Sequence, residues 1–119
     1  MRTRLEPLLA ELHAHTTWSD GLLSIRELTD LYGRSGFDVL CITDHVLRSD
    51  DPWQPDAHLT EKRHRGYLAE IESEGARALR RYGLLVLPGL ELTYNDFDPL
   101  LSAHAVAVGS RSFVAVDDG

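Results

Sequence analysis

Two histidines, His13 and His15, are separated by one residue and are followed by Asp20 in the next segment. In an extended strand, residues i and i+2 point to the same face, so both imidazoles can converge on one ion. The apolar run of residues 8–12 predicts a buried strand that ends near these histidines, and Asp20 adds an oxygen ligand beyond it. Taken alone, His-x-His is more typical of surface histidines than of a metal site.

Further candidate ligands lie at the ends of three other apolar runs: His45 after residues 39–42, Glu91 after residues 84–87, and His104 before residues 105–108. Parallel α/β folds build their sites at the carboxyl ends of strands, which is where most of these candidates lie. His104 is the exception, and it joins the others if residues 94–102 cross over the site. Together the four segments predict a metal site.

The expected order of elements is β-α-β-α-β-β. Ser24 and Glu27 form a capping box that begins a helix, and Gly36 ends it. A second helix is expected from residue 60 to residue 82, where Gly83 stops it. Strands are expected at residues 8–12, 38–43, 84–87 and 105–108, with residues 113–116 as a candidate for one more.

The motifs His13-x-His15 with Ser19-Asp20-Gly21, Thr43-Asp44-His45, Gly89-Leu90-Glu91 and His104 occur in this order along the chain. In this they resemble the polymerase and histidinol phosphatase (PHP) domain. The resemblance implies an α/β fold, a distorted (β/α)₇ barrel, with a two- or three-metal centre that hydrolyses phosphoesters. By position it implies three metal sites: His13, His15 and Glu91 at the first, Glu91 and His104 at the second, and Asp20 and His45 at the third.

The family pattern continues with a further histidine and an Asp-x-His, and nothing after His104 matches them. A full α/β barrel needs about 250 residues. We therefore expect residues 1–119 to be the amino-terminal half of one PHP domain, with the missing carboxy-terminal half as its partner. The alternative is a naturally short variant. As a half domain, the isolated chain is expected to be poorly stable, aggregation-prone and inactive.

The types of candidate ligand indicate the chemistry. Imidazole suits zinc, iron and manganese, and a mixed His/Asp/Glu set without thiolates favours an open catalytic site over a structural zinc site. Paired ions can clamp a phosphoester and activate a water whose pKa is near 7. We predict a metal-dependent phosphatase or phosphoesterase for a small phosphomonoester, such as a histidinol-phosphate-like substrate or a nucleotide, with short oligonucleotides as a sub-case. The alternative is a non-catalytic metal-binding domain with a structural or regulatory role in a larger protein.

Composition limits the partners and the cellular location that we expect for the protein. The net charge of −7 argues against a broad surface for long nucleic acids. No apolar stretch approaches the roughly 18 residues of a membrane span, and no secretory signal begins the chain, so we expect a cytoplasmic protein without membrane partners. The single cysteine, Cys41, lies within an apolar run and is expected to be a buried hydrophobic residue.

A few polar residues near the predicted site have two interpretations each. Asp44 could orient a ligand as a second-shell catalytic group, or it could be a turn residue. Arg48 could bind a substrate phosphate, or it could lie free in solvent. His58 and His64 flank the start of the second helix among basic residues, and a solvated basic face is favoured over metal binding.

Overall fold

The computed structural model describes residues 6–53 and 57–116 of the 119-residue chain. The elements follow one another as β1 (Ala10–Ala14), α1 (Ile25–Arg34), β2 (Val39–Leu47), α2 (Glu61–Tyr82), β3 (Leu85–Tyr94), the short 3-10 helix η1 (Pro99–Leu101) and β4 (Ala103–Val108). The order of helices and strands expected from the sequence is therefore confirmed.

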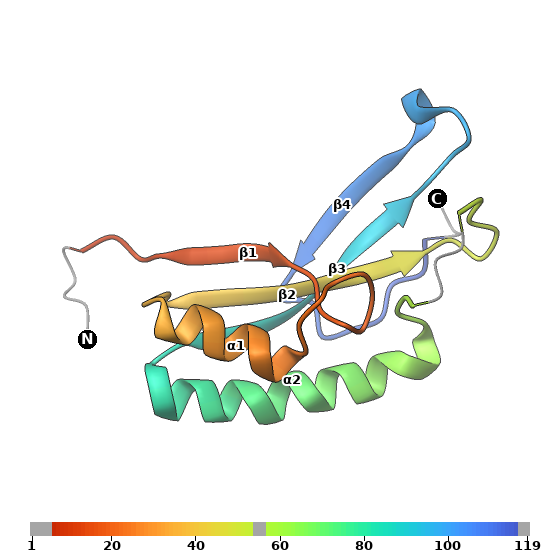
Figure 1. Cartoon of the computed structure of the whole chain (residues 1–119). Helices are drawn as coiled ribbons and strands as arrows, with labels where there is room; N and C mark the ends of the chain where they lie inside the picture. Colours follow the sequence, from red (N-terminus) through yellow and green to blue (C-terminus); the bar gives the residue numbers. More distant parts are fainter. Residues whose placement is uncertain (1–5, 54–56, 117–119) are drawn as a thin grey trace.

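The four strands form one curled sheet in the order β1-β2-β3-β4, with both helices on the same face (Figure 1). β1, β2 and β3 are parallel, because a helix returns the chain between each pair, and β4 runs antiparallel to β3. The carboxyl ends of the three parallel strands thus share one edge of the sheet. β4 begins at that same edge, which explains how a residue at the start of a strand can join residues at the ends of others.

Local signals set the helix boundaries. Ser24 caps α1 and forms the expected capping box with Glu27. Thr60 caps α2 by accepting a hydrogen bond from the backbone N–H of Arg63. At the other end of α2, Gly83 has a φ of 69°, a left-handed conformation that glycine adopts without steric cost. These three ends agree with the sequence prediction.

The core lies between the helices and the sheet. Alternate residues of β2, including Leu40 and Ile42, are fully buried on this side, opposite Tyr67 and Ile71 of α2. Two leucines of the helices, Leu31 on α1 and Leu79 on α2, are 47% and 55% exposed, because no other described element covers them. Cys41 is buried as expected, and burial raises the pKa of its thiol.

Four strand predictions need correction. β2 and β3 extend to Leu47 and Tyr94, beyond the expected ends at residues 43 and 87, so His45 and Glu91 lie within strands. The first strand is Ala10–Ala14 rather than 8–12, and it is not buried, since Leu8 is 68% and Leu12 46% exposed. Within the described chain β1 pairs with β2 alone, so it is an edge strand. Residues 113–116 form no strand; Phe113 packs against the ring of His64 on α2 instead, with 5.7 Å between ring centroids.

His64 also differs from its prediction. It is 5% exposed and packs between Tyr67 and Phe113, so it belongs to the interior and not to a solvated basic face. Burial lowers the pKa of its imidazole and favours the neutral ring. In the part of the chain that the structure covers, neither helix is both long and apolar enough to cross a membrane.

Candidate metal centre

All six residues predicted as metal ligands lie on the sheet or directly after it, around its carboxyl edge. They are His13 on β1, His15 just after it, Asp20 in the loop before α1, His45 on β2, Glu91 on β3 and His104 on β4. Within the sheet, His45 is the register partner of Glu91, and His104 is the register partner of Thr93. Directly paired residues project to the same face, so the sheet itself brings these side chains together.

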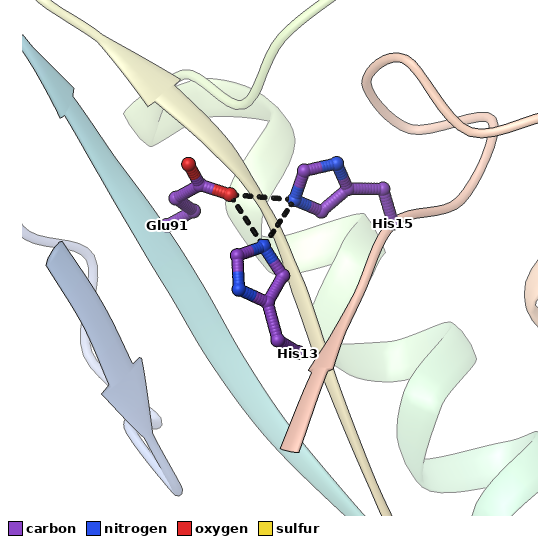
Figure 2. Close-up of side chains that lie close together, drawn as sticks. All are labelled: His13, His15 and Glu91. Carbon is purple, nitrogen blue, oxygen red and sulfur yellow. Dashed lines mark hydrogen bonds and ion pairs between the residues drawn. The ribbon is translucent and has the colours of Figure 1, made fainter. Parts of the chain in front are cut away.

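The first cluster contains His13, His15 and Glu91, whose side chains point toward one another (Figure 2). The Nε2 atoms of His13 and His15 are each 2.7 Å from Oε1 of Glu91, and 3.1 Å from each other. Three potential ligand atoms thus surround one point. Donor atoms about 2.1 Å from a metal ion and at right angles around it are about 3.0 Å apart, so this spacing fits an ion.

Glu91 joins this cluster to another histidine. Its second oxygen, Oε2, is 2.8 Å from Nδ1 of His104 and 3.8 Å from Nδ1 of His45. The side chain of Glu91 is only 4% exposed, so its two oxygens are held in a fixed direction. The carboxylate therefore faces different histidines with its two oxygens, as a group that bridges two ions does.

The second cluster contains His15, Asp20 and His45. Asp20 directs Oδ1 to Nδ1 of His15 at 2.7 Å and Oδ2 to Nε2 of His45 at 3.2 Å. The rings of His15 and His45 lie 4.3 Å apart between centroids. With a side chain that is 57% exposed, Asp20 forms the open side of the site.

Both ring nitrogens of His15 face carboxylates, Asp20 on one side and Glu91 on the other. A neutral imidazole carries one N–H, so it donates to one carboxylate and offers a lone pair toward the other. Metal-bound histidines commonly donate their second nitrogen to a carboxylate. The contacts of His15 fit this pattern, with Nε2 directed to the first cluster and Nδ1 directed to Asp20.

The electrostatics of the two carboxylates follow from these neighbours. Burial alone would raise the pKa of Glu91, but the imidazoles of His45, His15 and His13 hold it below its usual range. The pKa of Asp20 is lowered in the same way, because His45 and His15 outweigh its desolvation. Both groups are therefore ionised at neutral pH and give the cluster the negative charge that a cation requires.

Asp44 lies on the other face of β2 from His45, as strand alternation predicts. Its buried carboxylate accepts hydrogen bonds from the backbone N–H and the hydroxyl of Thr16, at 2.7 and 2.8 Å, and from the hydroxyl of Ser19. The Ser19 hydroxyl also accepts from the backbone N–H of His45. Burial raises the pKa of Asp44 despite these hydrogen bonds. Asp44 thus anchors the loop that carries Asp20.

Arg48 lies just after β2 with a side chain that is only 13% exposed, so it is not free in solvent. Its Nε is 3.1 Å from Asp50, and its guanidinium lies 4.5 Å from the centre of the Tyr94 ring. It also lines a cavity of about 380 Å³ together with His58 and Thr60. A role in binding substrate phosphate stays a prediction.

Sequence reasoning missed three residues that organise the site. The hydroxyl of Tyr67 lies 2.9 Å from the carbonyls of Ile42 and Gly89 and accepts from the N–H of Asp44. Thr93 and Asn95 contact the rings of His45 and His104. Of the three, only Tyr67 has a signal in the sequence, namely its spacing of four residues from Ile71, which places both on one face of a helix.

Comparison with known proteins gives one relative. The chain is 32% identical over 97 residues to the DNA polymerase/3'-5' exonuclease PolX of Bacillus subtilis (strain 168). The matched segment covers 77% of this chain but 16% of PolX, so the chain spans less than a fifth of the length of that relative. No family model matches the chain.

Proposed function

We propose that this chain provides metal ligands of a metal-dependent phosphoesterase of the PHP type. The observation that carries the proposal is the position of Glu91, whose two oxygens contact separate histidines at 2.7 and 2.8 Å. A buried carboxylate shared in this way is the arrangement expected for two neighbouring ions, which act as a clamp on a phosphoester. The curled sheet with helices on one face is in line with part of a (β/α)₇ barrel.

In this proposal His13, His15 and Glu91 hold one divalent ion, Glu91 and His104 a second, and Asp20 with His45 a third. Zinc, manganese or iron would suit such a donor set. When bound, the ions would lower the pKa of water to about 7 and stabilise charge on the phosphoryl oxygens. The residues of the chain hold the ions at fixed spacing, and Asp20 lies at the exposed side, where a substrate enters.

The substrate we propose is a small phosphomonoester. The similarity to a 3'-5' exonuclease favours a second candidate, the end of a short oligonucleotide, because an exonuclease also hydrolyses a phosphoester bond. The net charge of −7 disfavours long nucleic acid, since phosphates repel an acidic surface. Residues 1–119 would serve as the amino-terminal part of this domain, in the cytoplasm.

Metal binding is tested first, on the full chain. We expect Mn²⁺ or Zn²⁺ to bind in isothermal titration calorimetry, and Glu91→Gln to weaken the affinity by at least about 10–100-fold. Glu72→Gln is the matched control, because Glu72 is 65% exposed on α2 and pairs with Arg111 away from the cluster. Equal affinity of wild type and Glu91→Gln would refute the ligand assignment.

Catalysis is tested on the protein expressed from its full coding sequence. Loaded with metal, it should release 4-nitrophenol from 4-nitrophenyl phosphate, and chelation or Glu91→Gln should stop the release. Turnover of bis(4-nitrophenyl) phosphate and of a short oligonucleotide would favour the exonuclease candidate. Turnover that survives both chelation and Glu91→Gln would refute the mechanism. Metal binding without any turnover would favour the non-catalytic alternative.

A further inference from the structure

Three side chains at the end of β3 follow a spacing of two: Glu91, Thr93 and Asn95. Each of them contacts a histidine of the cluster. Glu91 takes part in the metal centre proposed above. Thr93 contacts the nitrogen of His45 that does not face Asp20, and Asn95 contacts the nitrogen of His104 that does not face Glu91. These two contacts restrict which nitrogen of each ring carries a hydrogen.

Thr93 favours a hydrogen on Nδ1 of His45. Its hydroxyl, in a side chain that is 1% exposed, donates to the backbone carbonyl of Glu91 at 3.2 Å. A hydroxyl has one proton, so toward Nδ1 of His45, at 2.6 Å, it acts as an acceptor. Nδ1 then carries the hydrogen. The lone pair of His45 is on Nε2, the atom that lies 3.2 Å from Asp20.

Asn95 favours a hydrogen on the other ring nitrogen, Nε2, in His104. Its Nδ2 donates to Oδ2 of Asp51 at 2.9 Å, and an ionised carboxylate only accepts, so this contact fixes the orientation of the amide. Asp51 is itself held in place, because it is 3% exposed and accepts from the backbone N–H of Trp53 at 2.8 Å. The amide oxygen of Asn95 therefore faces Nε2 of His104, at 2.9 Å, and Nε2 must carry the hydrogen.

The lone pair of His104 is then on Nδ1, which lies 2.8 Å from Oε2 of Glu91. Two electron-pair donors at this distance repel each other unless a cation is shared between them. We propose that Thr93 and Asn95 are positioning residues that hold His45 and His104 in opposite tautomers. His45 presents Nε2 and His104 presents Nδ1 to divalent metal ions. Because both lone pairs face carboxylates, this inference rests on the proposed function, in which a cation lies between them.

The tautomers can be measured directly in the full chain loaded with Zn²⁺, which is diamagnetic. Long-range ¹H–¹⁵N correlation spectra of ¹⁵N-histidine-labelled protein distinguish the two N–H forms of a neutral ring. They should be recorded about two pH units above the ordinary histidine pKa near 6.5. His45→Gln and His104→Gln assign the signals. We expect the Nδ1–H form for His45 and the Nε2–H form for His104.

Variants connect the tautomers to metal binding. Thr93→Val keeps the shape but removes the hydroxyl, so His45 should become a mixture of both forms and Mn²⁺ affinity should fall by about 10–100-fold. Thr93→Ser should restore both properties. Asn95→Leu should have the same effects on His104, and Asp51→Asn should have them to a smaller degree, because the amide of Asn95 is then free to turn over.

Thr29→Val is the matched control. Thr29 is a fully buried threonine of α1 whose hydroxyl donates to the carbonyl of Arg26. Thr29→Val should lower the stability without changing the tautomer of His45 or His104 or the affinity for Mn²⁺. The inference is overturned if wild-type His45 and His104 share one tautomer, or if Thr93→Val affects metal binding no more than Thr29→Val. A chain that binds neither Mn²⁺ nor Zn²⁺ would refute the proposed function and this inference with it, whereas a chain that binds Zn²⁺ with both rings in one tautomer would overturn this inference alone.

Discussion

Removal of the Tyr67 hydroxyl should destabilise the chain more than its size suggests. The ring of Tyr67 is fully buried under the sheet, and its oxygen lies 2.9 Å from the carbonyls of Ile42 and Gly89. It also accepts a hydrogen bond from the backbone N–H of Asp44. One hydroxyl thus links β2 and β3 just below the candidate metal ligands. Burial raises the pKa of this phenol, so it stays protonated and keeps its donor.

The magnitude follows from the groups left behind in Tyr67→Phe. The N–H of Asp44 loses its partner in a place that water does not reach, and a buried unsatisfied polar group costs about 1–3 kcal/mol. We therefore expect a loss of about 2 kcal/mol in the free energy of unfolding. With an unfolding entropy of about 2.1 cal/mol/K per residue, a chain of this length should melt about 8 °C lower.

Urea unfolding followed by circular dichroism, with a chelator present, measures this loss without a contribution from bound metal. Tyr32→Phe is the matched control, because the hydroxyl of Tyr32 makes a long contact of 3.5 Å with Glu11 on a half-buried surface. It should cost less than about 0.5 kcal/mol. If the free energies of unfolding of the two variants differ by less than about 0.5 kcal/mol, the hydroxyl of Tyr67 is not the partner that the backbone N–H of Asp44 requires.

Three further predictions concern other parts of the fold. Gly89→Ala should cost about 1–3 kcal/mol and weaken metal binding, because its Cβ would lie 2.6 Å from the carbonyl oxygen of Ala107 and push β4 away; unchanged unfolding and Mn²⁺ affinity would contradict this. The lowered pKa of His64 means that the unfolded chain binds more protons below about pH 6.5, so wild type should lose stability from pH 8 to pH 5. The variant His64→Phe, whose new ring would lie beside Phe113, should lose less free energy of unfolding over that pH range in urea titrations. An equal loss in wild type and variant would contradict this prediction. Val108→Lys places a charge on the outer strand β4, where Val108 is 49% exposed, and should reduce aggregation measured by light scattering; unchanged scattering would show that this edge is not where chains associate.

The helices and the order of strands could be predicted because their signals are local. The capping box at Ser24 and the glycine after α2 act through neighbouring residues, and they function the same way in any tertiary setting. The first strand was placed two residues early and called buried, because an apolar run cannot tell an edge strand from a central one. Leu8 and Leu12 are exposed since β1 has a described neighbour on one side only.

The sequence alone could predict that the candidate ligands lie close together, because the carboxyl ends of parallel strands lie at the same edge of a sheet. Even His104, at the start of its strand, lies there once β4 is antiparallel to β3. The groups that orient the ligands could not be found this way. The sequence gives no signal for Asn95, because its role depends on Asp51, which is 44 residues away along the chain. No periodicity encodes such a contact, because both residues lie outside the regular strands.

Strand alternation explains how one short segment serves two purposes. On β2, His45 projects to the face that carries Glu91, while its neighbour Asp44 projects to the opposite face and holds Thr16 and Ser19. The Ser19 hydroxyl, in turn, accepts from the backbone N–H of His45. The loop that carries Asp20 is therefore fixed to the same strand that carries its histidine partner. Two groups that we propose meet at one ion are positioned by a buried hydrogen-bond network, and this network needs no metal to form.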